Sequence, residues 1–234
     1  MTAMNDITVV SFDVWKTLIK VSPHYKPIRI DVLRSRLGLP IGITASVAAA
    51  VSIIDNQLNA KADVTGTQYG TRERLELIAQ RFGTMPTEAW VSGTTTVLRS
   101  HFRANPPLAN EPGLPQTLRR IRESGRRIVL ISNTGFTDGS HVRIGLEALG
   151  IWQYVEHGFF SDEVGVAKPS PEIFRLVINR TGVPASAIMH VGDNIQADYQ
   201  GATRAGLQAR LLSSRLHPMV APGQIVSSIA ELVL

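Results

Sequence analysis

The chain of 234 residues contains no cysteine. Disulfide bonds, thiolate metal sites and a cysteine nucleophile are therefore excluded. No low-complexity tract or internal repeat is visible. Hydrophobic residues make up 44% of the sequence and charged residues 18%, which is ordinary for a globular protein. A chain of this length can bury a sizeable core without covalent cross-links.

Long apolar runs are also scarce. No segment is expected to reach the roughly 18 apolar residues that a membrane span needs. The first ten residues, MTAMNDITVV, have neither the basic start nor the apolar stretch of a secretory leader. We therefore expect a soluble, cytoplasmic protein with no membrane partner.

Acidic residues are fewer than basic ones, with 19 Asp and Glu against 24 Lys and Arg, which gives a formal net charge of +5. Nucleic-acid binding would need a basic stripe with aromatic platforms or a recognisable module. Aromatic residues make up only 6% of the sequence, and neither feature is visible. We expect no nucleic-acid partner, and the positive charge instead favours a small anionic substrate.

Buried parallel strands are predicted where β-branched or aromatic runs end in polar residues: ITVVSFDVW, RRIVLISNT, YVEHGFFSD and AIMHVGDN, with LQARLL as a fifth. Helical patterns that end at glycine lie between them: PQTLRRIRES, SHVRIGLEALG, SPEIFRLVINRTG and QADYQGATRAG. This alternation predicts an α/β fold with a Rossmann-like parallel sheet and helices on both faces.

The segment between the first two strands breaks the alternation and is helical throughout: PIRIDVLRSRLG, ITASVAAAVSIIDNQLNAKAD, QYGTRERLELIAQRFG and PTEAWVSGTTTVLRSHFRAN. We expect an inserted helical domain at 21–107 and a core domain at 1–20 and 108–234. The proline-rich return at NPPLANEPGLP suits a hinge. The run TASVAAAVSII is expected in the core of the inserted domain or at a dimer interface, so the protein is a monomer or a homodimer.

Polar residues follow the predicted strands, and each one alone is typical of a turn or a helix cap. Because parallel strands bring their carboxyl ends to one edge of the sheet, we expect these residues to meet in one crevice. The set is Asp13, Thr17, Ser132, Asn133, Lys168, Asp193 and Asp198.

This set of side chains is suited to phosphoryl transfer. Two carboxylates from separate strands can hold Mg²⁺, which prefers oxygen ligands and often binds substrate phosphate as well. One carboxylate can then attack phosphorus. Lys168 would offset the negative charge, and the hydroxyls of Ser132 and Thr17 would hold phosphoryl oxygens.

At these positions the sequence resembles the haloacid dehalogenase-like (HAD) hydrolases. The segments VVSFDVWKTL, VLISNTG, EVGVAKPSPEIF and HVGDNIQADYQGATRAG are similar to the four motifs of that family, in the same order. The resemblance covers roughly residues 6–20 and 111–213. The helical insertion is similar to the cap that covers the site in members with small substrates, which implies that the cap selects the substrate.

The resemblance implies a role for each matching residue. Asp13 would be the nucleophile that forms a phosphoaspartate, and Lys168 would neutralise charge. Thr17, Ser132 and the adjacent Asn133 would bind phosphate. The implied Mg²⁺ ligands are the carboxylate of Asp13, the backbone carbonyl of Trp15, Asp193 and Asp198, the last of which could instead anchor Lys168.

One position departs from the family pattern. Phosphatases of the family carry a second aspartate two residues after the nucleophile, followed by glycine, where this chain has Trp15 and Lys16. That aspartate protonates the leaving group and then activates water, and general acid-base catalysis typically contributes about 10²–10⁴-fold. Lys16 and His24 are candidate substitutes, although a turn residue that points outward and a linker residue are the ordinary readings.

Three interpretations accommodate Trp15. The leaving group could need no proton, as in an acyl phosphate. It could be the halide of a 2-haloacid, since dehalogenases carry a tyrosine at this position, although they need no metal. The protein could also bind or regulate without turnover. Asp193 and Asp198 match the magnesium-binding form of the fourth motif and so argue against the second interpretation. The indole of Trp15 could stack on a substrate ring.

Basic residues of the insertion could bind a substrate carboxylate, although solvated helix faces are the ordinary reading. Spacing alone cannot select among them. The candidates are Arg72, Arg74, Arg99, His101 and Arg103.

Overall fold

A computed structural model describes residues 7–232 of the chain. Within them, six parallel strands form one sheet in the order β5-β4-β1-β6-β7-β8. The strands are β1 Val9–Phe12, β4 Arg127–Ser132, β5 His157–Phe160, β6 Ile188–Gly192, β7 Gln208–Leu212 and β8 Ile225–Val226. The predicted α/β fold with a Rossmann-like sheet is confirmed. Residues 1–6 and 233–234, which were expected in the core domain, lie outside the described residues.

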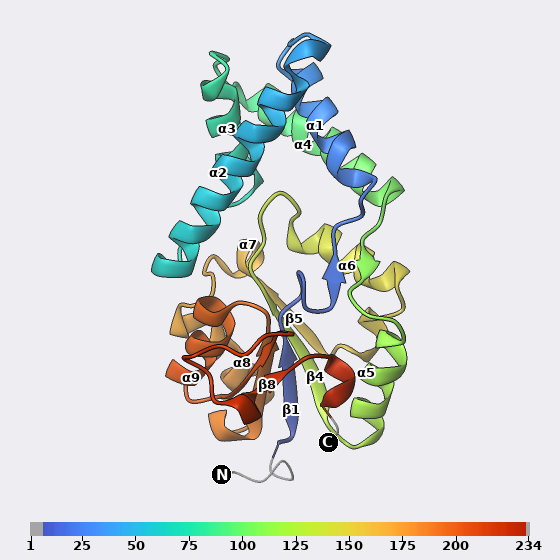
Figure 1. Cartoon of the computed structure of the whole chain (residues 1–234), viewed down its shortest axis with the longest axis vertical. Helices are drawn as coiled ribbons and strands as arrows, with labels where there is room; N and C mark the ends of the chain where they lie inside the picture. The colour runs from blue at the N-terminus through green and yellow to red at the C-terminus, as the bar shows by residue number, and fades with distance from the viewer. Residues whose placement is uncertain (1–6, 233–234) are drawn as a thin grey trace.

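Helices cover both faces of the sheet (Figure 1). Successive side chains of a strand point to opposite faces, so Val10 and Phe12 pack against α5 and α6, while Val9 packs against α8 and α9. The apolar side chains on each face thus form a buried cluster, as expected for a parallel sheet. The helices are α5 Leu114–Glu123, α6 Gly139–Ala148, α7 Ser161–Val164, α8 Pro171–Thr181 and α9 Gly201–Arg204. We call these helices and the sheet the sheet unit.

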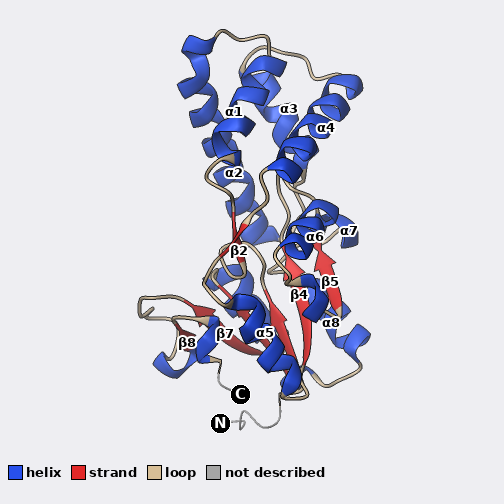
Figure 2. Ribbon diagram, turned by 90° about the vertical axis from the view of Figure 1, so that its right-hand side faces the viewer, coloured by secondary structure: helices blue, strands red, loops and turns tan. Residues whose placement is uncertain are grey.

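Four helices stand above the carboxyl ends of the strands (Figures 1 and 2). They are α1 Tyr25–Arg36, α2 Thr44–Thr65, α3 Thr71–Arg81 and α4 Glu88–Ala104, and we call them the helical unit. All four lie within the range predicted for the inserted domain. Their apolar faces form a separate buried cluster that includes Leu33, Val51 and Leu75. Phe136, which comes from the loop after β4 in the sheet unit, is buried in the same cluster.

A two-stranded antiparallel ribbon joins the two units. The chain leaves the sheet unit through β2, Ile19–Lys20, and returns through β3, Leu108–Ala109. Ile19 pairs with Ala109, and Lys20 with Leu108. The sequence predicted two linkers here but not their pairing, because two-residue strands are too short to leave a periodic pattern.

The segment after β6 also differs from its prediction. Residues 196–206 were expected to form one ordinary helix. The structure instead has a π-helical segment, Ile195–Gln200, followed by the short α9. The side chain of Asn194 begins the π-helical segment by accepting hydrogen bonds from the backbone N–H groups of Gln196 and Ala197. Such wide turns are rare and occur frequently at functional sites.

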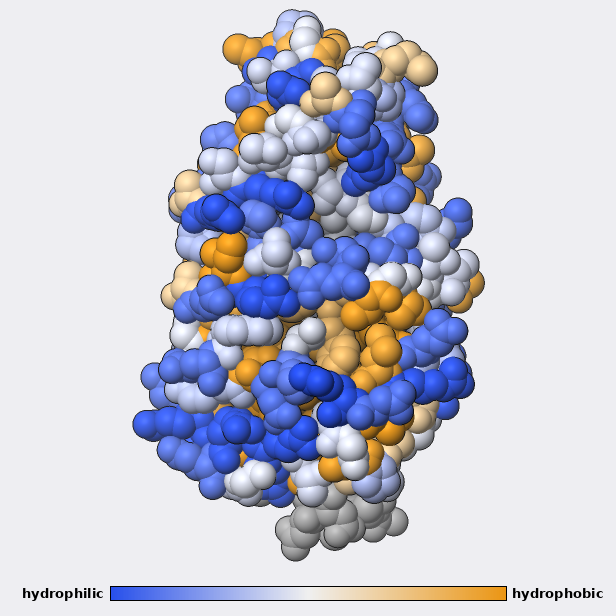
Figure 3. All heavy atoms as spheres, turned by 180° about the vertical axis from the view of Figure 1, so that it is seen from behind, coloured by the Kyte–Doolittle hydropathy of each residue, from blue (hydrophilic) through white to orange (hydrophobic). Residues whose placement is uncertain are grey.

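The helical stretch Ile41–Thr65, which contains α2, is by length and composition apolar enough to cross a membrane. The sequence was expected to hold no such segment. In the fold, however, α2 packs against α1 and α3, and Val47, Val51 and Ile54 join the buried cluster of the helical unit. Figure 3 shows a largely hydrophilic face, with apolar side chains gathered mainly in its lower half. One face of α2 therefore belongs to the core of the helical unit, and 28% of its apolar window is buried.

Arg74 connects α2 to α3 and is almost fully buried, with 2% exposure. Its Nε donates to Asp55 Oδ1 at 2.7 Å, and its Nη2 donates to Asn59 Oδ1 at 2.6 Å. Its Nη1 donates to the carbonyls of Tyr69 and Gly70. The expectation of a solvated helix face is therefore wrong for Arg74.

Replacing Arg74 should destabilise the helical unit. Arg74→Met leaves Asp55, Asn59 and two carbonyls without their donor, so we expect the free energy of unfolding to fall by about 3 kcal/mol. Arg72→Met is the matched control, because Arg72 is exposed and should leave stability nearly unchanged. Urea unfolding followed by circular dichroism measures both, and equal effects of the two substitutions would contradict the assignment.

Candidate active site

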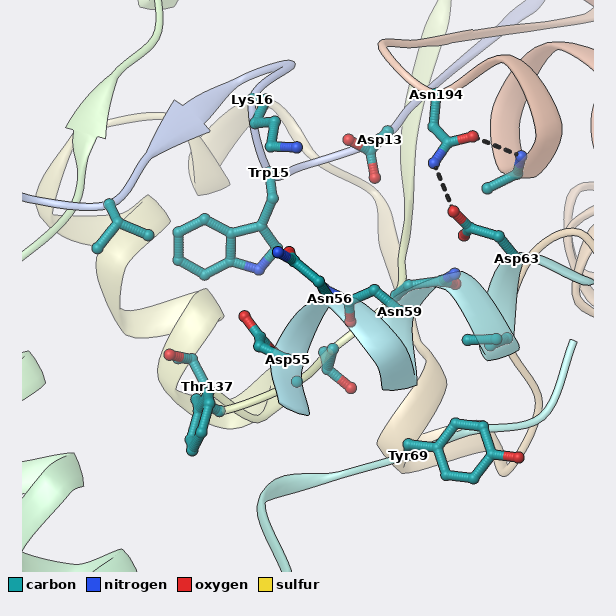
Figure 4. A pocket seen from close by; sticks show the side chains of 18 of the residues that line it. Asp13, Trp15, Lys16, Asp55, Asn56, Asn59, Asp63, Tyr69, Thr137 and Asn194 are labelled. Carbon is teal, nitrogen blue, oxygen red and sulfur yellow. Dashed lines mark hydrogen bonds between the residues drawn. The ribbon is translucent and has the colours of Figure 1, made fainter. Parts of the chain in front are cut away.

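The carboxyl ends of the central strands open into a cavity beneath the helical unit. Asp13 follows β1, Asn133 follows β4 and Asp193 follows β6, so the predicted convergence at the sheet edge is observed. The cavity has a volume of about 690 Å³, a size typical of small-molecule sites. Both units line it, and α2 contributes Asp55 and Asp63 (Figure 4).

Lys168 is the centre of the site and is 1% exposed. Its Nζ donates to Asp13 Oδ1 at 2.8 Å, to Asp198 Oδ1 at 2.6 Å and to the carbonyl of Ile131 at 2.7 Å. These three bonds use all the donors of the ammonium group. The hydroxyl of Thr17 donates to the other oxygen of Asp13 at 2.9 Å, so the carboxylate of Asp13 is held from two sides.

The pKa values reflect burial and this ion pairing. Burial opposes the charge on all three groups. For Lys168 the two carboxylates outweigh burial and raise the pKa. For Asp198 the charge of Lys168 and the hydrogen bond to His190 outweigh burial and hold the pKa well below its usual range. For Asp13 burial dominates and raises the pKa, although Lys168 and Thr17 counter it.

Asp13, Asp193 and Asp198 each offer a carboxylate oxygen, and these oxygens lie within 4.8 Å of one another. Burial raises the pKa of Asp193 to about 7, with the charges of Asp13 and Asp198 adding to the effect. Negative charge is thus in excess around Asp193. A divalent cation with a preference for oxygen would relieve this excess, so the residues fit Mg²⁺.

The carboxylates differ in how free they are to bind a cation. Asp198 Oδ1 accepts from Lys168 and lies 3.2 Å from His190 Nε2, and its Oδ2 accepts from the backbone N–H of Asn194. This geometry favours Asp198 as the anchor of Lys168. The carbonyl oxygen of Trp15 accepts no hydrogen bond from any described residue. It remains available to a cation, together with Asp193 and with Asp13, whose two oxygens accept one hydrogen bond each.

Gly192 permits the close approach of Asp198 to β6. A Cβ atom at this position would lie 2.2 Å from the Asp198 carboxyl carbon. No side chain can therefore replace this hydrogen without moving the anchor of Lys168.

The predicted phosphate-binding residues occupy different places. The amide of Asn133 holds the backbone of Lys168, donating to its carbonyl at 2.8 Å and accepting from its N–H at 2.7 Å. Ser132 is fully buried at the end of β4, and Thr17 is fully buried against Asp13. Asn133 lines the cavity, whereas Ser132 and Thr17 lie behind its wall.

Trp15 occupies the cavity side of the loop after β1, and its indole points into the cavity (Figure 4). Its ring lies edge-on to Phe102 of α4, with centroids 6.4 Å apart. Lys16 has a left-handed backbone with φ of 63°, and its Nζ lies 4.0 Å from Asp193 although its side chain is 81% exposed. His24 begins α1 and does not line the cavity.

Of the basic candidates in the insertion, only Arg74 lines the described cavity. Arg72 pairs with Glu88 at 2.7 Å on the surface of the helical unit. Arg99 pairs with Asp138 at 2.7 Å and so connects α4 to the N-terminus of α6. His101 and Arg103 lie outside the cavity lining.

Sequence reasoning missed several polar groups of the site. His190 of β6 is fully buried between Ser11, at 2.9 Å, and Asp198. Burial lowers the pKa of His190. Asp63 of α2 accepts from the amide of Asn194 at 2.9 Å (Figure 4), and burial raises the pKa of Asp63. A histidine in an otherwise apolar strand was the available signal for His190, and Asp63 had none.

Comparison with known proteins gives a consistent picture. A sequence profile described as haloacid dehalogenase-like hydrolase matches residues 7–206. Glyceraldehyde 3-phosphate phosphatase of Pyrococcus abyssi is 27% identical over 208 residues, which cover 86% of this chain and 79% of that protein.

Solved structures of low sequence identity share the fold. The HAD phosphatase from Thermococcus onnurineus matches with a TM-score of 0.70 at 19% identity, over 97% of this chain and 96% of its own. The L-2-haloacid dehalogenase from Xanthobacter autotrophicus matches over the same shares, with a TM-score of 0.65 at 17% identity.

The raised pKa of Asp193 predicts a pH dependence of stability without metal. Between pH 3.8, its ordinary pKa, and about 7, the folded state keeps a proton that the unfolded state has released. The free energy of unfolding of wild type therefore falls as the pH rises through that interval. Asp193→Asn cannot carry the charge, so it should match wild type near pH 4.

At pH 8 we expect Asp193→Asn to exceed wild type in unfolding free energy by about 2 kcal/mol, which allows for the side chain's partial exposure. Urea unfolding in EDTA at both pH values measures the difference. Asp31→Asn is the control, since Asp31 is exposed and distant from the cluster. A difference for Asp193→Asn that does not change with pH would contradict the assignment.

Proposed function

Because this chain belongs to the haloacid dehalogenase-like hydrolases, we propose that it hydrolyses a small phosphorylated compound with Mg²⁺, through a phosphoaspartate on Asp13. The observation that carries the proposal is the arrangement around Asp13. Its carboxylate is held by Lys168 and Thr17 at a cavity wall. Asp193 lies beside it, where negative charge is in excess. The phosphatase named among the relatives acts on a small phosphate compound, which supports this substrate class.

In the first step, a carboxylate oxygen of Asp13 forms a bond to phosphorus, and the bond from phosphorus to the leaving group breaks. In the second, water attacks the phosphoryl group and releases the Asp13 carboxylate and phosphate. Lys168 keeps the carboxylate oriented and offsets its charge throughout. Mg²⁺ held by Asp13, Asp193 and the Trp15 carbonyl would screen the repulsion between carboxylate and phosphate.

Trp15 restricts the leaving group. An indole cannot protonate a departing alkoxide, whereas an acyl phosphate releases a carboxylate that needs no proton. We infer that acyl phosphates and other good leaving groups react faster in this protein than simple alkyl phosphates do. Lys16 lies close enough to Asp193 to contact a substrate, but its side chain is largely exposed.

Halide displacement is the second candidate. The aromatic residue at position 15 and the shared fold with a haloacid dehalogenase favour it. The cluster of Asp13, Asp193 and Asp198 favours phosphoryl transfer, because displacement of halide from carbon needs no metal.

The proposal is tested by incubating the protein with acetyl phosphate, with and without Mg²⁺, and measuring intact mass. We expect a Mg²⁺-dependent phosphoryl adduct or release of phosphate in wild type and neither in Asp13→Asn, which has nearly the same shape but carries an amide in place of the nucleophilic carboxylate. Release of halide from a 2-haloacid without any phosphoryl transfer would establish the second candidate. No reaction in either assay would overturn both and leave a binding or regulatory role.

Restoring a carboxylate at position 15 should relax the restriction on leaving groups. We expect Trp15→Asp to hydrolyse propyl phosphate about 10²-fold faster than Trp15→Asn, because only the former supplies a general acid. The two variants lose the same indole and so form a matched pair. Their rates of adduct formation from acetyl phosphate should be similar. Equal rates of the two variants on propyl phosphate would show that position 15 does not limit the reaction.

A further inference from the structure

Arg29 on α1 lines the wall of the cavity that the helical unit provides. Its Nε atom is buried and has no hydrogen-bond partner. Among the residues that the structure describes, it is the one buried side-chain nitrogen or oxygen in this condition. A guanidinium carries five N–H donors, and a buried donor that forms no hydrogen bond is costly in free energy. The Nη groups of Arg29 donate to no described residue either and are not buried, so they are the donors that an acceptor in the cavity can reach.

The surroundings hold the guanidinium in place without neutralising it. Its central carbon lies 4.6 Å from the ring centroid of Phe136 and 6.0 Å from that of Tyr25. Cation-π contacts of this kind orient an arginine but do not balance its charge. Tyr25 is itself buried, and its hydroxyl donates to the carbonyl of Leu98.

The charges near Arg29 add up to an excess of positive charge. Arg74 approaches the same Phe136 ring, with its central carbon 5.7 Å from the centroid. Asp55 is the acidic neighbour that both arginines share, but it already forms an ion pair with Arg74 at 2.7 Å. Two cations and one carboxylate leave one positive charge unbalanced. Burial lowers the pKa of Arg29, with the charges of Tyr25 and Asp55 opposing the shift.

We propose that Arg29 binds a second anionic group of the substrate, a carboxylate or a phosphate, remote from the phosphoryl group that Asp13 attacks. The inference rests on the proposed function and specifies its substrate class, a small molecule with an anion at each end. A guanidinium offers paired donors that match the oxygens of either anion.

The loop after β4 relates the two ends of the cavity. Asn133 at its start holds Lys168 beside Asp13, and Phe136 three residues later lies against Arg29. A Cβ atom on the intervening Gly135 would lie 3.1 Å from the Arg74 guanidinium carbon, so the loop and the helical unit are in close contact. The phosphoryl site and the Arg29 site therefore belong to one cavity built by both units.

Binding of unreactive phosphonates tests the inference without requiring turnover. Propylphosphonate has no second anion, phosphonopropionate ends in a carboxylate, and propylene bisphosphonate ends in a second phosphonate. By calorimetry with Mg²⁺, we expect at least one of the last two to bind wild type about tenfold more tightly than propylphosphonate. The order of those two identifies which anion the site prefers.

Arg29→Gln should abolish this preference and leave the affinity for propylphosphonate nearly unchanged. Lys26→Gln is the matched control, because Lys26 is an exposed cation on the same helix that lines the same cavity. We expect it to alter the preference by less than about threefold, since an exposed charge is screened by salt. A preference that survives Arg29→Gln, or that wild type never shows, would overturn the inference.

Stability separates a binding role from a structural one. Removing an unpaired buried cation relieves a cost, so Arg29→Met without ligand should unfold at the same temperature as wild type or a higher one. A clearly lower unfolding temperature would assign Arg29 to the structure of the helical unit and contradict the inference.

Failure of this inference and failure of the proposed function give different results. A phosphoryl adduct on wild type Asp13 without any preference among the phosphonates contradicts only the role of Arg29. A preference lost in Arg29→Gln, with no reaction of acetyl phosphate, contradicts only the proposed chemistry.

Discussion

The buried ammonium of Lys168 is the interaction on which the site depends. It joins the end of β1, the end of β4 and the π-helical segment after β6 through Asp13, the Ile131 carbonyl and Asp198. Each buried charge is tolerable only because the others are present. Two further residues hold this ion-paired group in place: Asn133 binds the Lys168 backbone, and His190 contacts Asp198. The geometry of Asp13 is therefore set by three strands at once.

The sequence predicts those features that repeat along the chain. Runs of β-branched residues that end in polar groups identify the parallel strands, and the edge rule for parallel sheets then brings Asp13 and Asp193 together. The helices above the sheet follow from their periodic apolar positions. The sequence also predicts that Lys168 is close to Asp13, although not that all three of its donors are used.

Features that depend on packing between distant segments could not be predicted. Arg29 and Arg74 are two of many arginines in a basic chain, and only the fold shows that both contact Phe136. Asn133 looks like a turn residue until its partner 35 positions later is known. The pairing of β2 with β3 depends on residues about 90 positions apart and leaves no local pattern.

Phe136 belongs to the sheet unit by sequence but to the apolar cluster of the helical unit by packing. A motion that separates the two units while this loop stays with the sheet carries the ring out of its cluster and into water, at a cost of about 2 kcal/mol for a side chain of this size. Ligand entry and product release through such a motion would both bear that cost. The loop that supports the phosphoryl site thus also holds the two units together, through the burial of one aromatic ring.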